Sequence, residues 1–132
     1  MYDPIILTHA KNPLNFGHLH NPTHTAFEEN PVCGDKISLQ LIIADDIIQE
    51  SKFTGQGCYI CLASASIMTS SIIKLSTQEV IDLTQQFKEM LTADDDKRMG
   101  ALSVFTSIKK YPVRIKCAMM PWDALRSCLE TV

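Results

Sequence analysis

The strongest constraint on the fold is an alternating stretch in the first half of the chain. Between Lys36 and Ile43 every second residue is apolar, and these residues are Ile37, Leu39, Leu41 and Ile43. A period of two is typical of a β-strand with one buried face. The polar turn at 44–46 then leads into a predicted returning strand, Ile47 to Thr54, and Thr23 to Glu29 is a weaker third candidate. We therefore expect an antiparallel sheet with one covered face.

Helical patterns occupy most of the remaining chain. We expect helices over Tyr2–His9, from Cys58 to Lys74, from Ser76 onward, over Lys97–Lys109, and from Pro121 to the end. Ser76 and Glu79 have the spacing of a capping box. Proline is favoured in the first turn of a helix, which suggests a helix start at Pro121. The order predicts an α+β domain in which helices pack on one face of a small antiparallel sheet of about three strands.

Length and composition narrow the class of protein. A chain of 132 residues suits a single domain, 1–132, and a net charge of −3 gives no reason to expect a nucleic-acid partner. The sequence contains no apolar run of membrane-spanning length, and its N-terminus lacks the pattern of a signal peptide. We therefore expect a cytoplasmic protein without a membrane partner. In a reducing compartment, five cysteines indicate metal binding or thiol chemistry rather than disulfides.

Three of the cysteines lie in predicted loops or at element ends, where side chains can converge. Cys58 is expected at a helix N-terminus, whose partial positive charge favours a thiolate. Cys33 and Asp35 are two residues apart, so an extended backbone would point both side chains the same way. With Cys117, these residues would complete a tetrahedral set for zinc. The alternative is that the three cysteines are buried and inert.

Two cations precede Cys117 and bear on the charge of this set. Arg114 and Lys116 would offset the excess negative charge of three thiolates and a carboxylate. Arg114 could also pair with Asp35 and compete with the metal for that carboxylate.

The remaining candidate residues have simpler interpretations. Cys58 and Cys61 form a C-x-x-C motif, so a dithiol oxidoreductase is the alternative function. On a helix, however, Cys61 would align with core positions, and Cys128 lies on an apolar helical stripe. The polar segments predict solvated loops at His18, His20 and His24 and at 94–96.

Several motifs resemble those of the NifU/IscU/SufU iron–sulfur cluster assembly scaffolds. They are NPVCGD at 30–35, GQGCYI at 55–60 followed by ASAS at 63–66, PVRIKCA at 112–118, and an N-terminal segment that includes His9. The resemblance extends over nearly the whole chain and is greatest to the SufU branch. Lys116 stands where IscU-type scaffolds have histidine, and the segment between Cys58 and Cys117 is long, as in SufU-like proteins. The IscU chaperone motif is replaced by YPVR at 111–114, and the family usually has a small residue at position 61.

The resemblance implies a pocket made by Cys33, Asp35, Cys58 and Cys117. IscU-like members assemble a transient [2Fe–2S] cluster there, whereas SufU-like members bind zinc and accept persulfide sulfur from a SufS-like cysteine desulfurase. In that second role Cys33 would accept sulfur and Arg114 would engage Asp35. The product would pass to iron–sulfur acceptors or downstream assembly proteins. The resemblance thus implies a scaffold rather than an enzyme or, if it has catalytic activity, a sulfurtransferase; a purely structural zinc domain is a further alternative.

Overall fold

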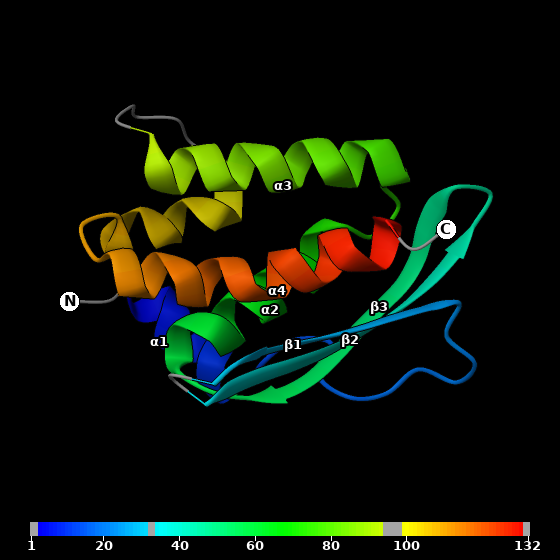
Figure 1. The fold of residues 1–132 in the computed structure, drawn as a ribbon, viewed down its shortest axis with the longest axis horizontal. Coiled ribbons are helices and arrows are strands. Elements are labelled where there is room, and N and C mark those ends of the chain that lie inside the picture. Colours follow the sequence, from blue (N-terminus) through cyan, green and yellow to red (C-terminus); the bar gives the residue numbers. More distant parts are fainter. Residues whose placement is uncertain (1–2, 32–33, 94–98, 131–132) are drawn as a thin grey trace.

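Three antiparallel strands form the sheet. The computed structural model describes residues 3–31, 34–93 and 99–130. Strands β1 (His24–Asn30), β2 (Asp35–Ala44) and β3 (Ile47–Gln56) lie in the order β1-β2-β3 (Figure 1). Leu39 pairs with Ala26 on one side and with Phe53 on the other. The predicted hairpin and the weaker third strand are confirmed.

The inner face of the sheet follows the alternation in the sequence. Ile37, Leu39 and Leu41 are fully buried, whereas Lys36 is exposed. The pairing of β2 with β3 shifts between Ile42 and Ile43, which is a β-bulge. Ile43 is consequently only partly buried, although it still packs against the core.

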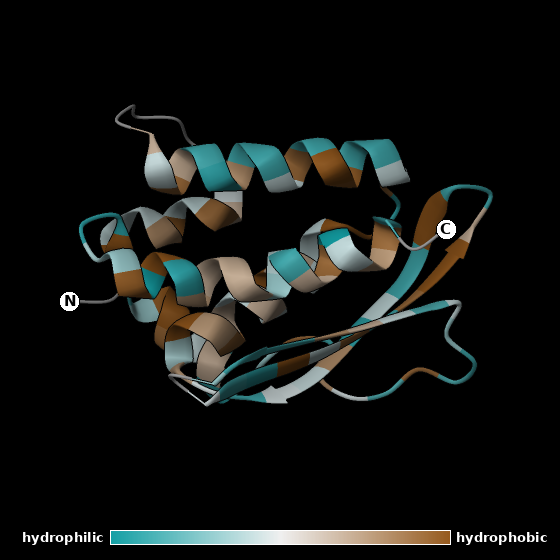
Figure 2. Ribbon diagram, viewed as in Figure 1, coloured by the Kyte–Doolittle hydropathy of each residue, from teal (hydrophilic) through white to brown (hydrophobic). Residues whose placement is uncertain are grey.

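The helices stack on one face of this sheet (Figure 1). They are α1 (Pro4–Lys11), α2 (Tyr59–Ser71), α3 (Thr77–Thr92), the 3₁₀ helix η1 (Gly100–Ile108) and α4 (Pro112–Glu130). Helices α2 and α4 contact the sheet, and α3 packs on α4. Hydrophilic and hydrophobic residues alternate along α3 in Figure 2, as expected for an amphipathic surface helix that buries one side. The predicted α+β architecture is confirmed.

Two predicted helices differ from the structure. The last helix begins at Pro112, not at Pro121, which lies inside it. Both prolines are followed by helical sequence, and the first-turn preference selected the wrong one. In place of the helix predicted over Lys97–Lys109 there is a 3₁₀ helix from Gly100, whose φ of +59° is incompatible with a continuous α-helix. The loop predicted at 94–96 lies outside the described residues.

Hydrogen bonds between buried groups fix α4 against α2. The Ser64 hydroxyl donates to the Ala118 carbonyl at 2.6 Å and accepts from Trp122 Nε1 at 3.1 Å. The Trp122 ring stacks on Phe87 with a centroid distance of 4.7 Å. Because these contacts hold two neighbouring turns of α4, they also fix the position of Cys117 relative to α2.

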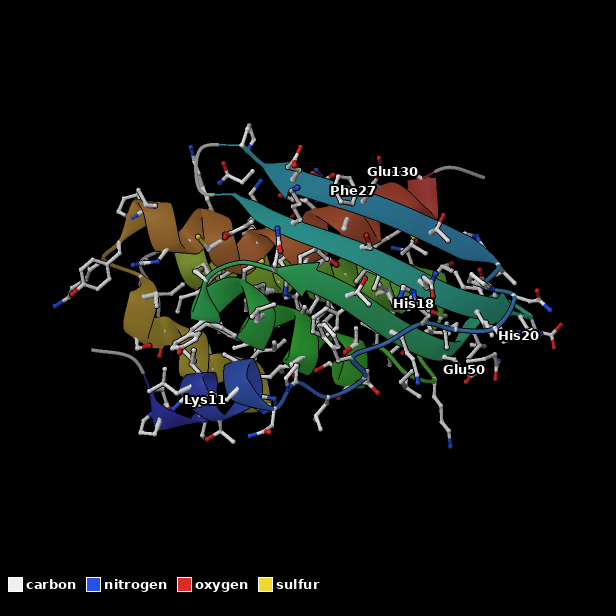
Figure 3. All side chains as sticks on the ribbon, turned by 90° about the horizontal axis from the view of Figure 1, so that it is seen from below. Lys11, His18, His20, Phe27, Glu50 and Glu130 are labelled. Carbon is white, nitrogen blue, oxygen red and sulfur yellow. The ribbon has the colours of Figure 1, made fainter. Side chains whose placement is uncertain are left out.

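The N-terminal segment is attached to α2 and to the edge of β3. Ser66 Oγ lies 2.8 Å from His9 Nδ1 and accepts the Leu14 amide at 2.8 Å. Burial lowers the pKa of His9, consistent with the structural role expected of it. The chain then runs along β3, where the Gly17 amide donates to the Phe53 carbonyl at 2.9 Å. His18 and His20 follow on an exposed loop (Figure 3), as predicted, whereas His24, predicted in the same loop, is the first residue of β1.

Candidate metal centre

Asp35 occupies the first position of β2 and is almost completely buried, with 2% of its surface exposed. Its Oδ1 accepts the backbone amide of Cys58 at 3.1 Å. Its Oδ2 is buried and has no hydrogen-bond partner among the described residues. A buried carboxylate oxygen without a partner is costly, so this atom is suited to accept a cation or a further hydrogen-bond donor.

Gly57 makes the approach of this carboxylate possible. A Cβ at position 57 would lie 2.5 Å from Asp35 Oδ1 and 2.8 Å from its Cγ, and φ is +157°. No larger residue fits there without displacing the carboxylate. The absence of a side chain at Gly57 therefore shapes the site.

Cys58 is the N-cap of α2, and its Sγ accepts the backbone N–H of Cys61 at 3.4 Å. Its extended φ and ψ, −73° and 163°, place it outside the helix while its sulfur lies over the first turn. The predicted position of Cys58 at a helix start is confirmed. Cys58 itself is half-buried.

Cys117 projects into the site from within α4. The sequence had suggested a loop or an element end at this position, and that prediction was wrong. It is 2% exposed, and burial raises the pKa of its thiol. The negative charges of Cys58 and Asp35 raise that pKa further. Pro121, four residues later, lacks the N–H that would normally bond to the Cys117 carbonyl.

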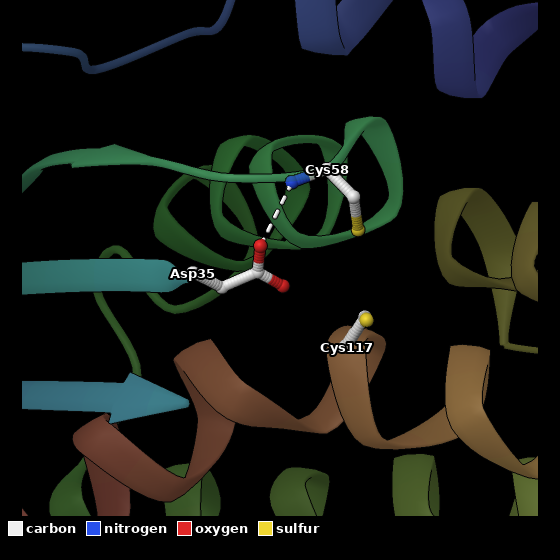
Figure 4. A group of neighbouring side chains, drawn as sticks. All are labelled: Asp35, Cys58 and Cys117. Atoms are coloured by element: carbon white, nitrogen blue, oxygen red, sulfur yellow. Dashed lines mark hydrogen bonds between the residues drawn. The ribbon is translucent and has the colours of Figure 1, made fainter. Parts of the chain in front are cut away.

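The three side chains converge on one point (Figure 4). Among the described residues, Asp35, Cys58 and Cys117 form the one group of at least three potential metal-binding side chains, and their ligand atoms lie within 4.8 Å of one another. Two sulfurs and one oxygen at this spacing fit a tetrahedral zinc site that lacks one ligand. The unpartnered Asp35 Oδ2 supports the same fit.

The other predicted site residues lie around this group. Cys33, predicted as the fourth ligand, is outside the described residues. Arg114 is half-buried and precedes Cys117 by three residues on α4, so the two side chains lie on the same face of the helix. Lys116 is exposed. The close contact of Gly57 with Asp35 was not predicted from the GQGCYI motif, although a glycine directly before the cysteine is the available signal.

The remaining cysteines are part of the core. Cys61 is fully buried, and burial together with the charges of Asp35 and Cys58 raises its pKa. Burial also raises the pKa of Cys128 to about 11. The core positions predicted for both residues are confirmed. The antiparallel sheet lacks the parallel βαβ context of a thioredoxin-like dithiol enzyme, which argues against that alternative.

Within the described part of the chain, each helix is too short or too polar to cross a bilayer. A curated relative from Bacillus subtilis, named zinc-dependent sulfurtransferase SufU, is 37% identical over 128 residues, which is 95% of this chain and 86% of the relative. The iron–sulfur cluster assembly scaffold protein IscU of Streptococcus pyogenes is 33% identical and covers 98% of this chain and 83% of its own length.

Solved structures agree with these sequence matches. The crystal structure of a putative iron–sulfur cluster assembly scaffold protein for the SUF system, from Fervidobacterium islandicum, superimposes with a TM-score of 0.92. It is 29% identical, and the match covers 98% of this chain and 96% of that one. The family model described as the NifU-like N-terminal domain matches residues 1–126. The chain therefore belongs to the NifU-like N-terminal domain family.

Proposed function

We propose that this protein, as one domain spanning 1–132, acts in iron–sulfur cluster assembly as a zinc-binding acceptor of sulfur. The observation that carries the proposal is the convergence of Asp35, Cys58 and Cys117, which come from β2, α2 and α4. Cys33 supplies the fourth ligand by its position two residues before Asp35 in the sequence. Relatives named for zinc-dependent sulfur transfer and for cluster assembly support the same assignment.

The chemistry of the ligands suits a site that can open. Bound zinc would keep the thiols of this site deprotonated and fixed in position. Asp35 provides an oxygen ligand beside sulfur ligands, which is the weaker partner for a soft metal site. Arg114 lies on the same face of α4 as Cys117, where its guanidinium can compete for the Asp35 carboxylate.

In the proposed transfer, the protein's own thiol does the chemistry. The Cys33 thiolate attacks the outer sulfur of a persulfide on a cysteine desulfurase, and the sulfur–sulfur bond of that persulfide breaks. Cys33 then carries the persulfide, and the desulfurase cysteine leaves as a thiolate, so no external oxidant or reductant is required. The partner is a SufS-like cysteine desulfurase in the cytoplasm, and the sulfur passes on to downstream assembly proteins or iron–sulfur acceptors.

Metal content tests the site itself. We expect about one zinc per purified chain, and we expect zinc to be lost when Cys33, Asp35, Cys58 or Cys117 is changed to alanine. Cys128→Ser is the matched control, because this thiol is buried in the core and lies outside the ligand group. Full zinc content in the Asp35 or Cys117 variant would contradict the proposed pocket.

A second experiment separates a sulfur acceptor from a cluster scaffold. The protein is mixed with a SufS-like desulfurase and cysteine, and persulfide is located by mass spectrometry. An acceptor carries persulfide on Cys33 and raises desulfurase turnover. A scaffold that assembles a [2Fe–2S] cluster as its cargo would instead develop an iron–sulfur chromophore when iron is supplied, without raised turnover, and that result would overturn the acceptor role.

A further inference from the structure

We propose that Cys58 and Cys61 form a redox-sensitive pair in which oxidation closes a disulfide and removes Cys58 from the metal site. The inference rests on the proposed metal site for its consequence but not for the disulfide itself. It assigns a role to Cys61, which the sulfur-acceptor function does not use.

The geometry places the two thiols on the same helical turn. Cys58 is the N-cap of α2, Cys61 is three residues later, and the Cys58 sulfur already accepts the Cys61 amide at 3.4 Å. Side chains three apart on a helix have Cβ atoms about 5–6 Å apart, and a disulfide needs about 3.5–4.5 Å. The proposed disulfide therefore needs a rotation at Cys58, which has extended φ and ψ and lies outside the hydrogen-bonded turns of α2.

The two cysteine residues differ in their access to solvent. Cys58 is half-buried at the site, whereas Cys61 is 0% exposed. An oxidant therefore reaches Cys58 first, and Cys61 is positioned to react with the oxidised sulfur from the protein side. An accessible attacking thiol beside a buried resolving thiol is the arrangement expected of a C-x-x-C pair at a helix start.

A peroxide supplies the oxidising equivalents. The Cys58 sulfur attacks one peroxide oxygen, the O–O bond breaks, and the products are a sulfenic acid on Cys58 and one water. The Cys61 sulfur then attacks the Cys58 sulfur. The S–S bond forms, the S–O bond breaks, and the Cys61 proton leaves with the hydroxyl group as a second water. Two thiols lose two electrons in total, and a dithiol reductant reverses the change.

The disulfide has a direct consequence for metal binding. A thiolate is the form that binds zinc, whereas a disulfide sulfur is uncharged and does not replace it as a ligand. Oxidation would leave Asp35 and Cys117 without the α2 ligand. Cys117 competes as a partner for Cys58, because their ligand atoms lie within 4.8 Å. It lies on α4, which the Ser64–Ala118 hydrogen bond holds against α2, so a Cys58–Cys117 disulfide is the competing product that peptide mapping must exclude.

Peptide mapping of the metal-free protein tests the disulfide. After treatment with hydrogen peroxide and blocking of the remaining thiols, we expect the peptide that contains both Cys58 and Cys61 to have lost two hydrogens and to resist alkylation until dithiothreitol is added. Zinc affinity should fall at least about tenfold on oxidation and recover on reduction. In Cys61→Ala that peptide should show no internal disulfide, and Cys128→Ser should behave like the unchanged protein.

Two further results separate the parts of the proposal. Cys61→Ala and Cys61→Ser should bind zinc normally before oxidation, which also shows that they fold. A map that joins Cys58 to Cys117 or Cys33, or peroxide-treated protein in which Cys61 stays reduced, overturns the pair. If the Cys58–Cys61 disulfide forms while zinc affinity is unchanged, it is the metal site under the proposed function that is wrong.

Discussion

The two ends of β3 lead to two helix N-termini of opposite character. At its start, Ile47 bridges to Ser76, which caps α3. The Ser76 hydroxyl accepts the Glu79 amide at 3.1 Å, and the Glu79 carboxylate accepts the Ser76 amide at 2.9 Å. At its far end, β3 passes through Gly57 to Cys58, whose sulfur caps α2 at 3.4 Å.

The difference separates a terminus suited to stability from one suited to chemistry. Oxygen-bearing side chains are the preferred N-caps, and a capping box satisfies two free amides at once. Sulfur is a weak acceptor, so the N-terminus of α2 is held less well by its own cap. The same terminus donates the Cys58 amide to Asp35 Oδ1, while Oδ2 of that carboxylate is buried without a hydrogen-bond partner among the described residues. Local rules of stability are thus broken where the proposed metal ligands gather.

The largest effect on stability and zinc affinity should come from adding one methyl group at Gly57, next to the N-terminus of α2. In Gly57→Ala the new Cβ would lie 2.5 Å from Asp35 Oδ1, so the carboxylate or the chain must move. We expect the free energy of unfolding to fall by about 1–3 kcal/mol, the usual cost of overpacking. Zinc affinity should fall as well, because Asp35 leaves its position. Urea denaturation with a chelator and zinc titration measure the two effects.

Gly100→Ala is the matched control for this substitution. Its φ is +59°, so alanine is strained there too, but nothing lies within 4 Å of the added Cβ. We expect it to lower stability by about 1 kcal/mol and to leave zinc affinity unchanged. Equal losses of zinc affinity in both variants would show that Gly57 acts through general stability rather than through contact with Asp35.

The strands and the cap of α3 are predictable from the sequence. The strands follow from the alternation at 36–43, and the cap of α3 follows from the spacing of Ser76 and Glu79, because both are local patterns. The predicted start of α4 was wrong, because Pro112 and Pro121 are both prolines followed by helical sequence and either could occupy the first turn. Only the packing of Pro121 in the core, next to the buried Trp122, distinguishes them.

The site was predicted in part, from residue types and family motifs rather than from local rules. Asp35, Cys58 and Cys117 were named, and they meet, but their ligand role stays a prediction. Two features had no local signal. The hydrogen bond from the Cys58 amide to Asp35 spans 23 residues of sequence, and the Ser64 hydrogen bonds that position α4 span 54 and 58. Contacts over such separations depend on the tertiary packing of elements whose partners the sequence does not name.

A substitution at Ser76, the N-cap of α3, should have an intermediate effect on stability. Ser76→Ala removes the hydroxyl that accepts the Glu79 amide, and loss of a serine cap costs about 1 kcal/mol. Zinc content and affinity should be unchanged, because α3 supplies none of the proposed ligands. Denaturation of the metal-free protein and metal analysis of the purified protein check the two statements. Loss of zinc in this variant would mean that the two helix termini are not independent.

The smallest effect should be a gain in stability, from a substitution at Cys58. It tests most directly the difference between the N-termini of α2 and α3. In Cys58→Ser an oxygen replaces the sulfur at the N-cap of α2, and serine is among the preferred residues there. We expect the metal-free protein to become more stable by about 0.5 kcal/mol. Thermal unfolding in the presence of a chelator should show a correspondingly higher midpoint than in the unchanged protein.

Zinc should reverse the ranking of the two proteins. A ligand that binds only the folded state adds about 2.7 kcal/mol at a hundred times its Kd, which exceeds the gain from a better cap. The unchanged protein should therefore be the more stable one when zinc is present, and Cys58→Ser should show little response to zinc because it has lost a thiolate ligand. If serine lowers stability in the chelator as well, Cys58 is not a compromised cap, and its sulfur contributes to the fold independently of any metal. A crossing of the two stability orders would instead show that this terminus gives up intrinsic stability for metal binding, which the capping box of α3 does not.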